Sequence, residues 1–286
     1  MVDWKSQEEM RKDSSIFIKL IHALLGVYAW ECVISLDFDW AVLTGKKKFR
    51  WPLIFYFAGR YLLLFALIGI VISLDTPSEI NCQALYTFNQ LAGDAAVGLA
   101  SINLSLRTIA IWSDNKLVIV LLVLIIIGHW SLILQGVLLT AVWVPGVGCQ
   151  ITDSKTAILS ATFIYSMCFD FVVMCLSAYK LARMAICTKG THTKFVRMLF
   201  SDGLIYFFIA FVANLIATVF MVLNFNTTTS IVFNVPAAMA STIVASRVVR
   251  RLINFQPGSE LVISGKNSGI IFESNSAVLS MQYAEP

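Results

Sequence analysis

The sequence has few charged residues, and this shortage excludes an ordinary soluble domain. Asp, Glu, Lys and Arg make up 13% of the 286 residues, whereas about a quarter is usual in soluble proteins. Hydrophobic residues make up 58%, which is more apolar side chain than a soluble core of this size can bury. The composition therefore predicts an integral membrane protein surrounded by the lipid bilayer. The modest net charge of +4 gives no indication of nucleic-acid binding.

Histidine is also scarce, and this argues against an enzyme. The three histidines, His22, His129 and His192, are widely spaced, whereas an intramembrane metal hydrolase needs clustered His and acidic ligands. The sequence has neither a Ser/His/Asp spacing typical of hydrolases nor a phosphate-binding loop. We therefore expect no catalytic residue, no metal and no cofactor. The last apolar run, 231–249, contains no lysine, which excludes a retinal Schiff base there.

Long apolar runs account for most of the chain. A spanning helix needs about 20 mostly apolar residues. Six segments qualify easily, at roughly 16–36, 52–74, 117–142, 156–179, 203–223 and 231–249. A seventh run, 83–106, is weaker because it holds Asn89, Gln90, Asp94 and Asn103, and an amphipathic helix outside the membrane is its alternative interpretation. The first run follows a segment of mixed charge and not a usual signal peptide, so we expect it to be retained.

Basic residues decide between six and seven spans. Lys and Arg favour the cytoplasmic side of short loops, and loops 37–51 and 180–202 hold 4 and 5 of them. Both loops face the cytoplasm only if 83–106 crosses the membrane, which leaves 15 basic residues inside and 4 outside. The sequence therefore predicts an all-α bundle of seven transmembrane helices, with the N-terminus outside and the C-terminus in the cytoplasm. The expected parts are an extracellular segment 1–15, a seven-helix domain 16–252 and a disordered cytoplasmic tail 253–286.

Two of the six cysteines stand apart in this topology. Cys82 and Cys149 are the two that fall on the outer side, where disulfides persist. We expect a Cys82–Cys149 bridge that ties the second outer loop to the third span, as in G-protein-coupled receptors; two free thiols are the alternative. Asn226 begins an Asn-Thr-Thr glycosylation sequon on the same side. Its very short loop lies close to the bilayer, which argues against modification.

A polar network is expected within the spans, and its members are Glu31, Arg60, Asp94, Asp170, Asn103, Asn214 and Asn234. Charges inside a membrane usually face the bundle interior and have a partner. At a rise of about 1.5 Å per residue the four charges lie about 8–18 Å from the cytoplasmic edge. We therefore predict that Arg60 pairs with Glu31 or Asp94, with snorkelling to lipid headgroups as the alternative. The asparagines add hydrogen bonds between helices, and the network either fixes helix packing or forms a switch or ion site.

One stretch near the N-terminus combines two acids, a Ser-Leu step, a Trp, a basic loop and an Arg-Tyr pair. Its sequence is WECVISLDFDWAVL followed by KKKFRWPLIFYFAGRYL. It resembles the N-terminal signature of a large basidiomycete fungal family of multi-pass membrane proteins of unknown function. Glu31 stands where that family usually has Asp, and Asp39 where it usually has Glu. Residues 201–219 resemble the family's penultimate helix, and residues 245–252 resemble the end of its conserved region. The resemblance therefore covers nearly the whole chain. It implies a layout similar to seven-helix receptors and no established activity.

A receptor-like sensor that signals through its cytoplasmic loops is the function that these features favour. Its ligand would be an unidentified small molecule, and its partner a cytoplasmic G protein or another signalling protein. The third span lacks an acid-Arg-Tyr triplet, and the last has Asn234-Val235-Pro236 in place of Asn-Pro-x-x-Tyr, so the common receptor subclass is not supported. We expect the plasma membrane or a membrane of the secretory pathway.

Two other functions remain open. A transporter or channel can use intramembrane acids such as Asp94 and Asp170, although the sequence lacks paired Gly/Pro-broken helices in symmetric positions. A purely structural membrane protein is the other alternative, because a buried ion pair can serve packing alone.

Overall fold

The computed structural model describes residues 7–47, 49–76, 78–136, 139–144, 148–154, 156–187, 193–223 and 232–254. The chain divides into two compact units, Met1–Leu252 and Ile253–Pro286. Nearly all of the tail expected at 253–286 lies outside the described residues, as does the sequon at Asn226. The helices and strands described below belong to the first unit, apart from the last two residues of its final helix.

Helices make up nearly all of the described chain. They are α1 (Gln7–Val33), α2 (Leu36–Leu43), α3 (Pro52–Asp75), α4 (Cys82–Ile111), α5 (Lys116–Gly136), α6 (Thr156–Cys187), α7 (Thr193–Leu223) and α9 (Asn234–Asn254). Six of them, α1 and α3 to α7, are long and apolar enough to cross a membrane. The chain is thus a helical membrane protein. The remaining long helix, α9, has 21 residues but is less apolar than the other six.

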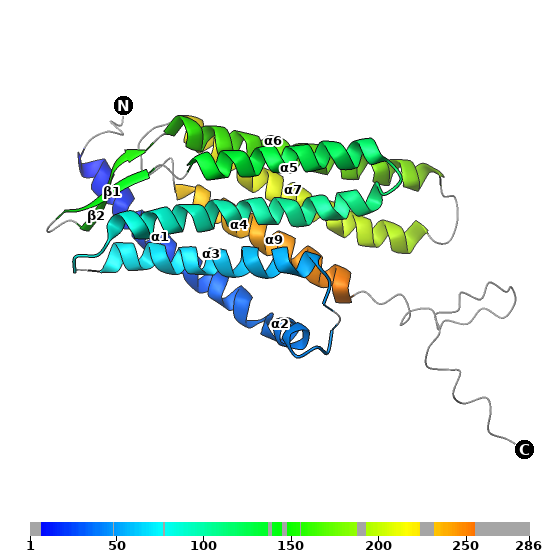
Figure 1. Ribbon diagram of the computed structural model, residues 1–286, viewed down its shortest axis with the longest axis horizontal. Coiled ribbons are helices and arrows are strands. Elements are labelled where there is room, and N and C mark those ends of the chain that lie inside the picture. The colour runs from blue at the N-terminus through cyan, green and yellow to red at the C-terminus, as the bar shows by residue number, and fades with distance from the viewer. Residues whose placement is uncertain are drawn as a thin grey trace, which may run out of the picture. The chain divides into compact units, whose positions relative to one another are not determined.

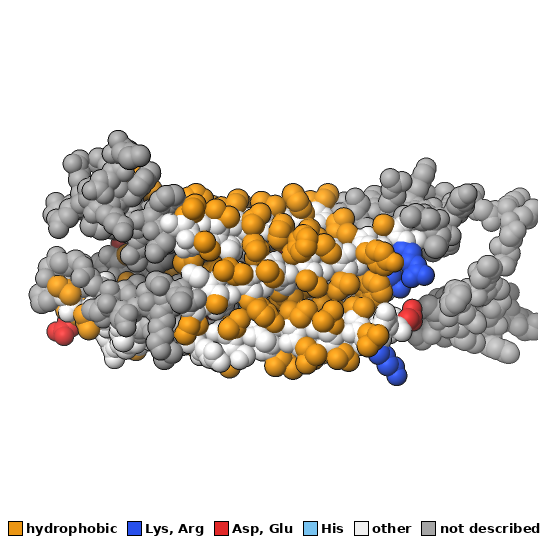
Figure 2. Space-filling model, turned by 90° about the horizontal axis from the view of Figure 1, so that it is seen from above, with side chains coloured by type: hydrophobic (Ala, Val, Ile, Leu, Met, Phe, Trp, Pro, Cys, Tyr) orange, Lys and Arg blue, Asp and Glu red, His pale blue; other side chains and the backbone are white. Residues whose placement is uncertain are grey.

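The long helices lie side by side and alternate in direction (Figure 1). One end of the bundle carries a β-hairpin, and we call it the hairpin end; the opposite end carries α2, and we call it the α2 end. Hydrophobic side chains cover the middle of the helices, while Lys and Arg side chains gather near one end (Figure 2). This distribution suits a bundle whose middle contacts lipid and whose ends contact water.

Helix α4 has the least apolar membrane-length window of the six candidate spans and is the most enclosed of them. In α4 the membrane-length window has a mean hydropathy of 1.2 and is 67% buried, whereas in α5 the values are 2.9 and 17%. One hydrophobic cluster joins α4 to α1, α3 and α9 through Tyr28, Leu67 and Ala238. A second joins α4 to α6, α7 and α9, and includes Phe169 and Phe207. Since most of α4 and much of α9 pack against other helices, these helices can carry polar residues away from lipid.

The structure corrects the sequence prediction at the hairpin end. The span expected at 117–142 ends early, because α5 stops at Gly136 and the chain then forms strand β1 (Leu139–Val144). This strand pairs antiparallel with β2 (Gly148–Ser154), with Trp143 opposite Cys149. The β-branched Thr140, Val142 and Val144 alternate with their neighbours, a period that favours a strand over a helix. The all-α class predicted from the sequence is confirmed, and this short hairpin is a local addition at one end of the bundle.

The first span lies close to its expected position at 16–36, since the part of this helix that can cross a membrane is Ser15–Val33. Helix α1 begins at Gln7, so it extends well beyond the apolar run, and it ends at Val33. The hydroxyl of Ser35 donates to the backbone carbonyl of Glu31 at 2.7 Å just past this end. The separate helix α2 follows and buries Phe38 and Asp39 against the bundle. It takes up part of what the sequence predicted to be a loop.

Candidate functional site

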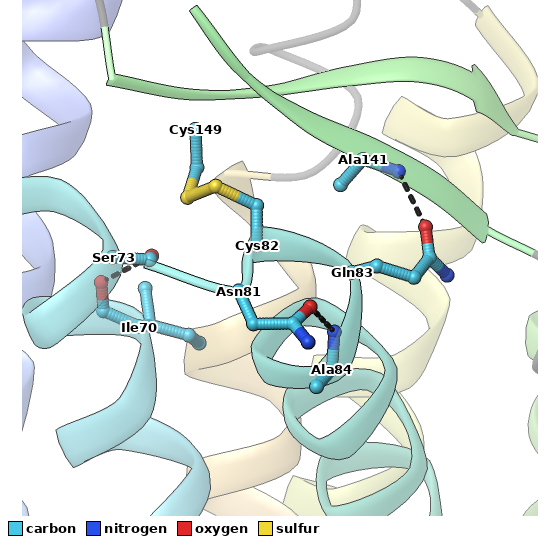
Figure 3. Close-up of a disulfide and its surroundings, with 8 residues drawn as sticks. All are labelled: Ile70, Ser73, Asn81, Cys82, Gln83, Ala84, Ala141 and Cys149. Carbon is cyan, nitrogen blue, oxygen red and sulfur yellow. Dashed lines mark hydrogen bonds between the residues drawn. A yellow bond between two sulfur atoms is a disulfide. The ribbon is translucent and has the colours of Figure 1, made fainter. Parts of the chain in front are cut away.

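At the hairpin end, a disulfide joins Cys82 at the start of α4 to Cys149 of β2, with the two Cα atoms 5.5 Å apart (Figure 3). The side chain of Asn81 caps α4 by accepting from the backbone N–H of Ala84 at 3.0 Å. The backbone N–H of Ala141 in β1 donates to the side-chain oxygen of Gln83 at 2.8 Å. Both strands are thus fastened to the first turn of α4, which fits the disulfide expected from the sequence.

Arg60 lies within α3 near the α2 end and is 2% exposed. Its Nε is 3.4 Å from Oδ2 of Asp39, an ion-pair distance. Its Nη1 donates to the hydroxyl of Tyr56 at 2.8 Å, and its Nη2 donates to the backbone carbonyl of Cys32 at 2.7 Å. The hydroxyls of Tyr56 and Tyr61 in turn donate to the two oxygens of Asp39, at 2.8 and 3.1 Å. The guanidinium and the carboxylate are therefore enclosed together.

The prediction that Arg60 pairs with Glu31 or Asp94 is wrong, although a carboxylate does hold it. Asp39 was expected in a cytoplasmic loop, outside the membrane. Helix α2 folds back on the bundle and buries Asp39, which is 1% exposed, beside Arg60. Among the described atoms, Glu31 contacts Arg60 only through its backbone carbonyl, which accepts a hydrogen bond from Arg60 Nη2 at 3.4 Å.

The carboxylate of Glu31 binds two arginines of α9. Arg247 donates from Nε to Oε1 at 3.1 Å and from Nη2 to Oε2 at 2.6 Å. Arg250 donates from Nη2 to Oε1 at 2.7 Å. From the sequence both arginines counted only as cytoplasmic charges. Their spacing of three residues places them on one face of a helix, and this is the sequence signal from which a shared partner could have been inferred.

We call these seven side chains the α2-end charge network: Glu31, Asp39, Tyr56, Arg60, Tyr61, Arg247 and Arg250. Each of its two carboxylates faces at least one arginine. The network joins α1, α2, α3 and α9. The side chain of Arg247 is 48% exposed, whereas that of Arg60 is 2% exposed. The contact between α1 and α9 is consequently open to solvent, and the contact between α2 and α3 is closed.

A second polar group lies deeper in the bundle, around Asp170 of α6. This carboxylate is 4% exposed. The hydroxyl of Ser101 in α4 donates to its Oδ1 at 3.0 Å, and Nδ2 of Asn214 in α7 donates to its Oδ2 at 2.5 Å. Seven residues further along both α4 and α6, the hydroxyls of Thr108 and Ser177 lie 2.8 Å apart. We call Asp170, Ser101 and Asn214 the Asp170 site.

The structure does not bring the other expected members into either group. Asp94 is partly buried and has no hydrogen bond or ion pair within the described part of the chain. The side-chain oxygens of Asn103 and Asn234 are buried without a hydrogen-bond partner among the described residues. The single network expected from the sequence is therefore two separate groups and three polar side chains that belong to neither.

No protein-family model matches this chain, and no curated protein matches it either. Among the described residues, no group of three or more His, Cys, Asp or Glu side chains is placed to hold a metal ion. Function is therefore inferred from the two polar groups and the disulfide-linked hairpin. These features belong to a helical membrane protein with a hairpin cap at one end and a charged contact between its first and last described helices at the other.

Proposed function

We propose that this protein is a receptor-like sensor with seven transmembrane helices, an external N-terminus and a cytoplasmic C-terminus. The observation that carries the proposal is the contact of Glu31 in α1 with Arg247 and Arg250 in α9. It joins the first and last described helices at the end where the basic loops lie. A sensor needs an element with two arrangements, and a partly exposed ion pair between two helices can open at modest cost.

Helix α9 is the seventh span in this proposal. Its hydropathy is too low for a helix exposed to lipid, but ten of its residues, from Ala237 to Val249, are buried among other helices. Its arginines are confined to its last two turns, close to the α2 end. Polar residues inside a membrane are tolerated when they face the bundle or reach the interface. With α9 spanning, its arginines lie on the same side as the basic loops 37–51 and 180–202, as the positive-inside rule requires.

The hairpin end is the proposed ligand-facing side, in the plasma membrane or a membrane of the secretory pathway. The disulfide fixes β2 to the start of α4, and the Gln83–Ala141 hydrogen bond fixes β1 to the same turn. A small ligand held there would act directly on α4, which contacts most of the bundle. Binding at the hairpin could therefore change the helix contacts at the α2 end.

The test measures nucleotide exchange on purified G-protein α subunits by the full-length protein in nanodiscs. Glu31→Gln removes the charge that holds Arg247 and Arg250, so we expect a several-fold higher basal exchange rate than with the unmodified chain. Glu79→Gln, the same change at an exposed residue of the hairpin end, is the matched control and should leave the rate unchanged. Equal rates for all three proteins on every subunit family would contradict coupling to G proteins.

A transporter is the second candidate, and the Asp170 site favours it. Among the described residues this carboxylate is held only by neutral donors, and intramembrane acids often mark ion pathways. Proteoliposomes distinguish the two functions. A transporter would carry Na⁺ or protons across the vesicle membrane, and Asp170→Asn would abolish that flux. A sensor would leave the ion gradient intact.

A further inference from the structure

The Asp170 site contains a buried carboxylate whose partners among the described residues are all neutral. Its two hydrogen bonds come from a serine hydroxyl and an asparagine amide, and within the described residues no Lys, Arg or His lies within ion-pair distance. Burying an ionised carboxylate is costly unless an opposite charge accompanies it. The site is thus short of one positive charge.

Two further oxygen atoms near Asp170 have no hydrogen-bond partner among the described residues. Oγ of Ser166 lies one turn before Asp170 on the same face of α6, and Ser166 is 2% exposed. Oδ1 of Asn214 belongs to the carboxamide whose nitrogen donates to Asp170, and Asn214 is 1% exposed. A rotation of that carboxamide exchanges its oxygen and nitrogen with little change of shape. Beside the Asp170 carboxylate, the site therefore has a buried hydroxyl oxygen and a buried amide oxygen that make no hydrogen bond within the described residues.

We propose that Asp170, Asn214, Ser101 and Ser166 bind a small monovalent cation of the Na⁺ type. An all-oxygen set is what hard cations prefer. One carboxylate compensates one positive charge, so a divalent ion would leave an unbalanced charge in the bundle. The proposal goes beyond the sensor function and does not depend on it, because the site lies in the bundle interior and not in the α2-end charge network.

Among the titratable groups on the neighbouring helices, Asp170 is the one placed to bind the cation. On α4, Asp94 lies seven residues before Ser101 and has no polar partner among the described residues. On α5, the ring of His129 packs 5.8 Å from that of Phe169, the neighbour of Asp170. Residues 204–223 of α7 include no charged side chain. A cation in this region therefore meets one carboxylate that is already oriented by hydrogen bonds.

Thermal unfolding of the full chain in nanodiscs tests the site. Melting is followed while NaCl replaces N-methyl-D-glucamine chloride at constant ionic strength, because a ligand of the folded state raises the melting temperature with its concentration. We expect a saturable rise of a few degrees for the unmodified chain and none for Asp170→Asn. Ser166→Ala should need several-fold more Na⁺ for half of the rise. Asp94→Asn, the matched control, should behave like the unmodified chain.

Equilibrium binding of ²²Na⁺ to the unmodified protein supports or overturns the proposal even if Asp170→Asn fails to fold. Saturable binding that Ser166→Ala weakens supports it. Absence of saturable binding, or a rise that Asp170→Asn retains, overturns it. Melting that depends on pH but not on Na⁺ also overturns it, because Asp170 would then hold a proton in place of the cation. None of these outcomes changes the nucleotide-exchange test, so the two proposals fail independently.

Discussion

Two buried aspartates in this molecule have opposite surroundings. Asp39, at the α2 end, is 1% exposed and shares its enclosure with Arg60 and two tyrosine hydroxyls. Asp170, in the middle of α6, is 4% exposed and receives hydrogen bonds only from Ser101 and Asn214 among the described residues. The first carboxylate has its counter-charge built into the fold, whereas the second must take a proton or a cation from outside. The difference separates a structural pair from a site that can respond to its surroundings.

The largest expected effect comes from breaking the compensated pair. Arg60→Leu leaves Asp39 buried without its counter-charge, and Asp39→Leu does the same to Arg60. Each single change should lower the stability by about 3–5 kcal/mol, because a lone buried charge is worse than none. The double variant should be more stable than the worse single variant. Unfolding of the purified proteins by titration with denaturing detergent measures these differences.

Arg60→Leu and its combination with Asp39→Leu form a double-mutant cycle, and the combination of Arg60→Leu with Asp170→Asn is its matched control. The two sites share no partner, so their effects on stability should add within about 0.5 kcal/mol. A double Arg60→Leu/Asp39→Leu variant that is no more stable than its worse single would contradict the pairing.

The same pair shows what the sequence predicts and where its information ends. Depth along α3 predicted that Arg60 needs an acid, and a carboxylate does lie 3.4 Å from its Nε. The predicted partner was wrong because the correct one, Asp39, can be identified only if one knows that the chain turns back at Ser35 and that α2 buries Asp39. That turn depends on packing of Phe38 and Val42 against the bundle, which a residue-by-residue scale of hydropathy does not contain.

The membrane spans also show which features the sequence predicts and which depend on packing. Apolar runs predicted helices that are long and apolar enough to cross a membrane, and the described part of the chain contains six such helices. The run at 83–106 was the weakest on composition, yet α4 is the most enclosed of the six. Its polar residues reflect a central position that only the assembled bundle defines. The hairpin was missed because its strand Leu139–Val144 continues the apolar run of α5 without a change in hydropathy.

The next largest effect concerns the disulfide. It constrains the hairpin end covalently, whereas the α2 end is held by ion pairs. Replacing Cys82 and Cys149 together by Ser should destabilise the protein by about 2–4 kcal/mol, since the bridge closes a long loop. The hairpin end should become more accessible to proteases, while the α2 end should not. Limited proteolysis followed by mass spectrometry locates the cuts. The double replacement of Cys168 and Cys175, which are free and exposed, is the control and should be nearly neutral.

A smaller effect is expected at the solvent-open part of the α2-end charge network. Glu31→Gln removes the charge that faces Arg247 and Arg250, and we expect a loss of about 1.5–3 kcal/mol, the range for hydrogen bonds to charged groups. Added salt should weaken the contact in the unmodified chain, because Arg247 is half exposed. Stability measured at low and high NaCl should therefore differ for the unmodified chain and not for Glu31→Gln. The same salt dependence in both proteins would show that the contact contributes nothing measurable.

The smallest change, and the one that tests the comparison most directly, is the isosteric replacement of each aspartate by asparagine in Na⁺-free buffer at neutral pH. Asp39→Asn removes a charge that Arg60 needs, so the protein should become less stable by a few kcal/mol. Asp170→Asn removes a charge that nothing in the described bundle compensates. The new carboxamide can still accept from Ser101, and its N–H can donate to Oδ1 of Asn214 after that side chain rotates.

We therefore expect Asp170→Asn to leave stability unchanged, or to raise it by up to about 1 kcal/mol, because the hydrogen bonds persist and the desolvation cost of the charge is gone. Detergent titration of both variants beside the unmodified chain measures the contrast. Adding NaCl should then stabilise the unmodified chain above Asp170→Asn and leave the deficit of Asp39→Asn in place. If the two asparagine variants lose the same stability in Na⁺-free buffer, Asp170 has a counter-charge after all and the two aspartates play the same structural part.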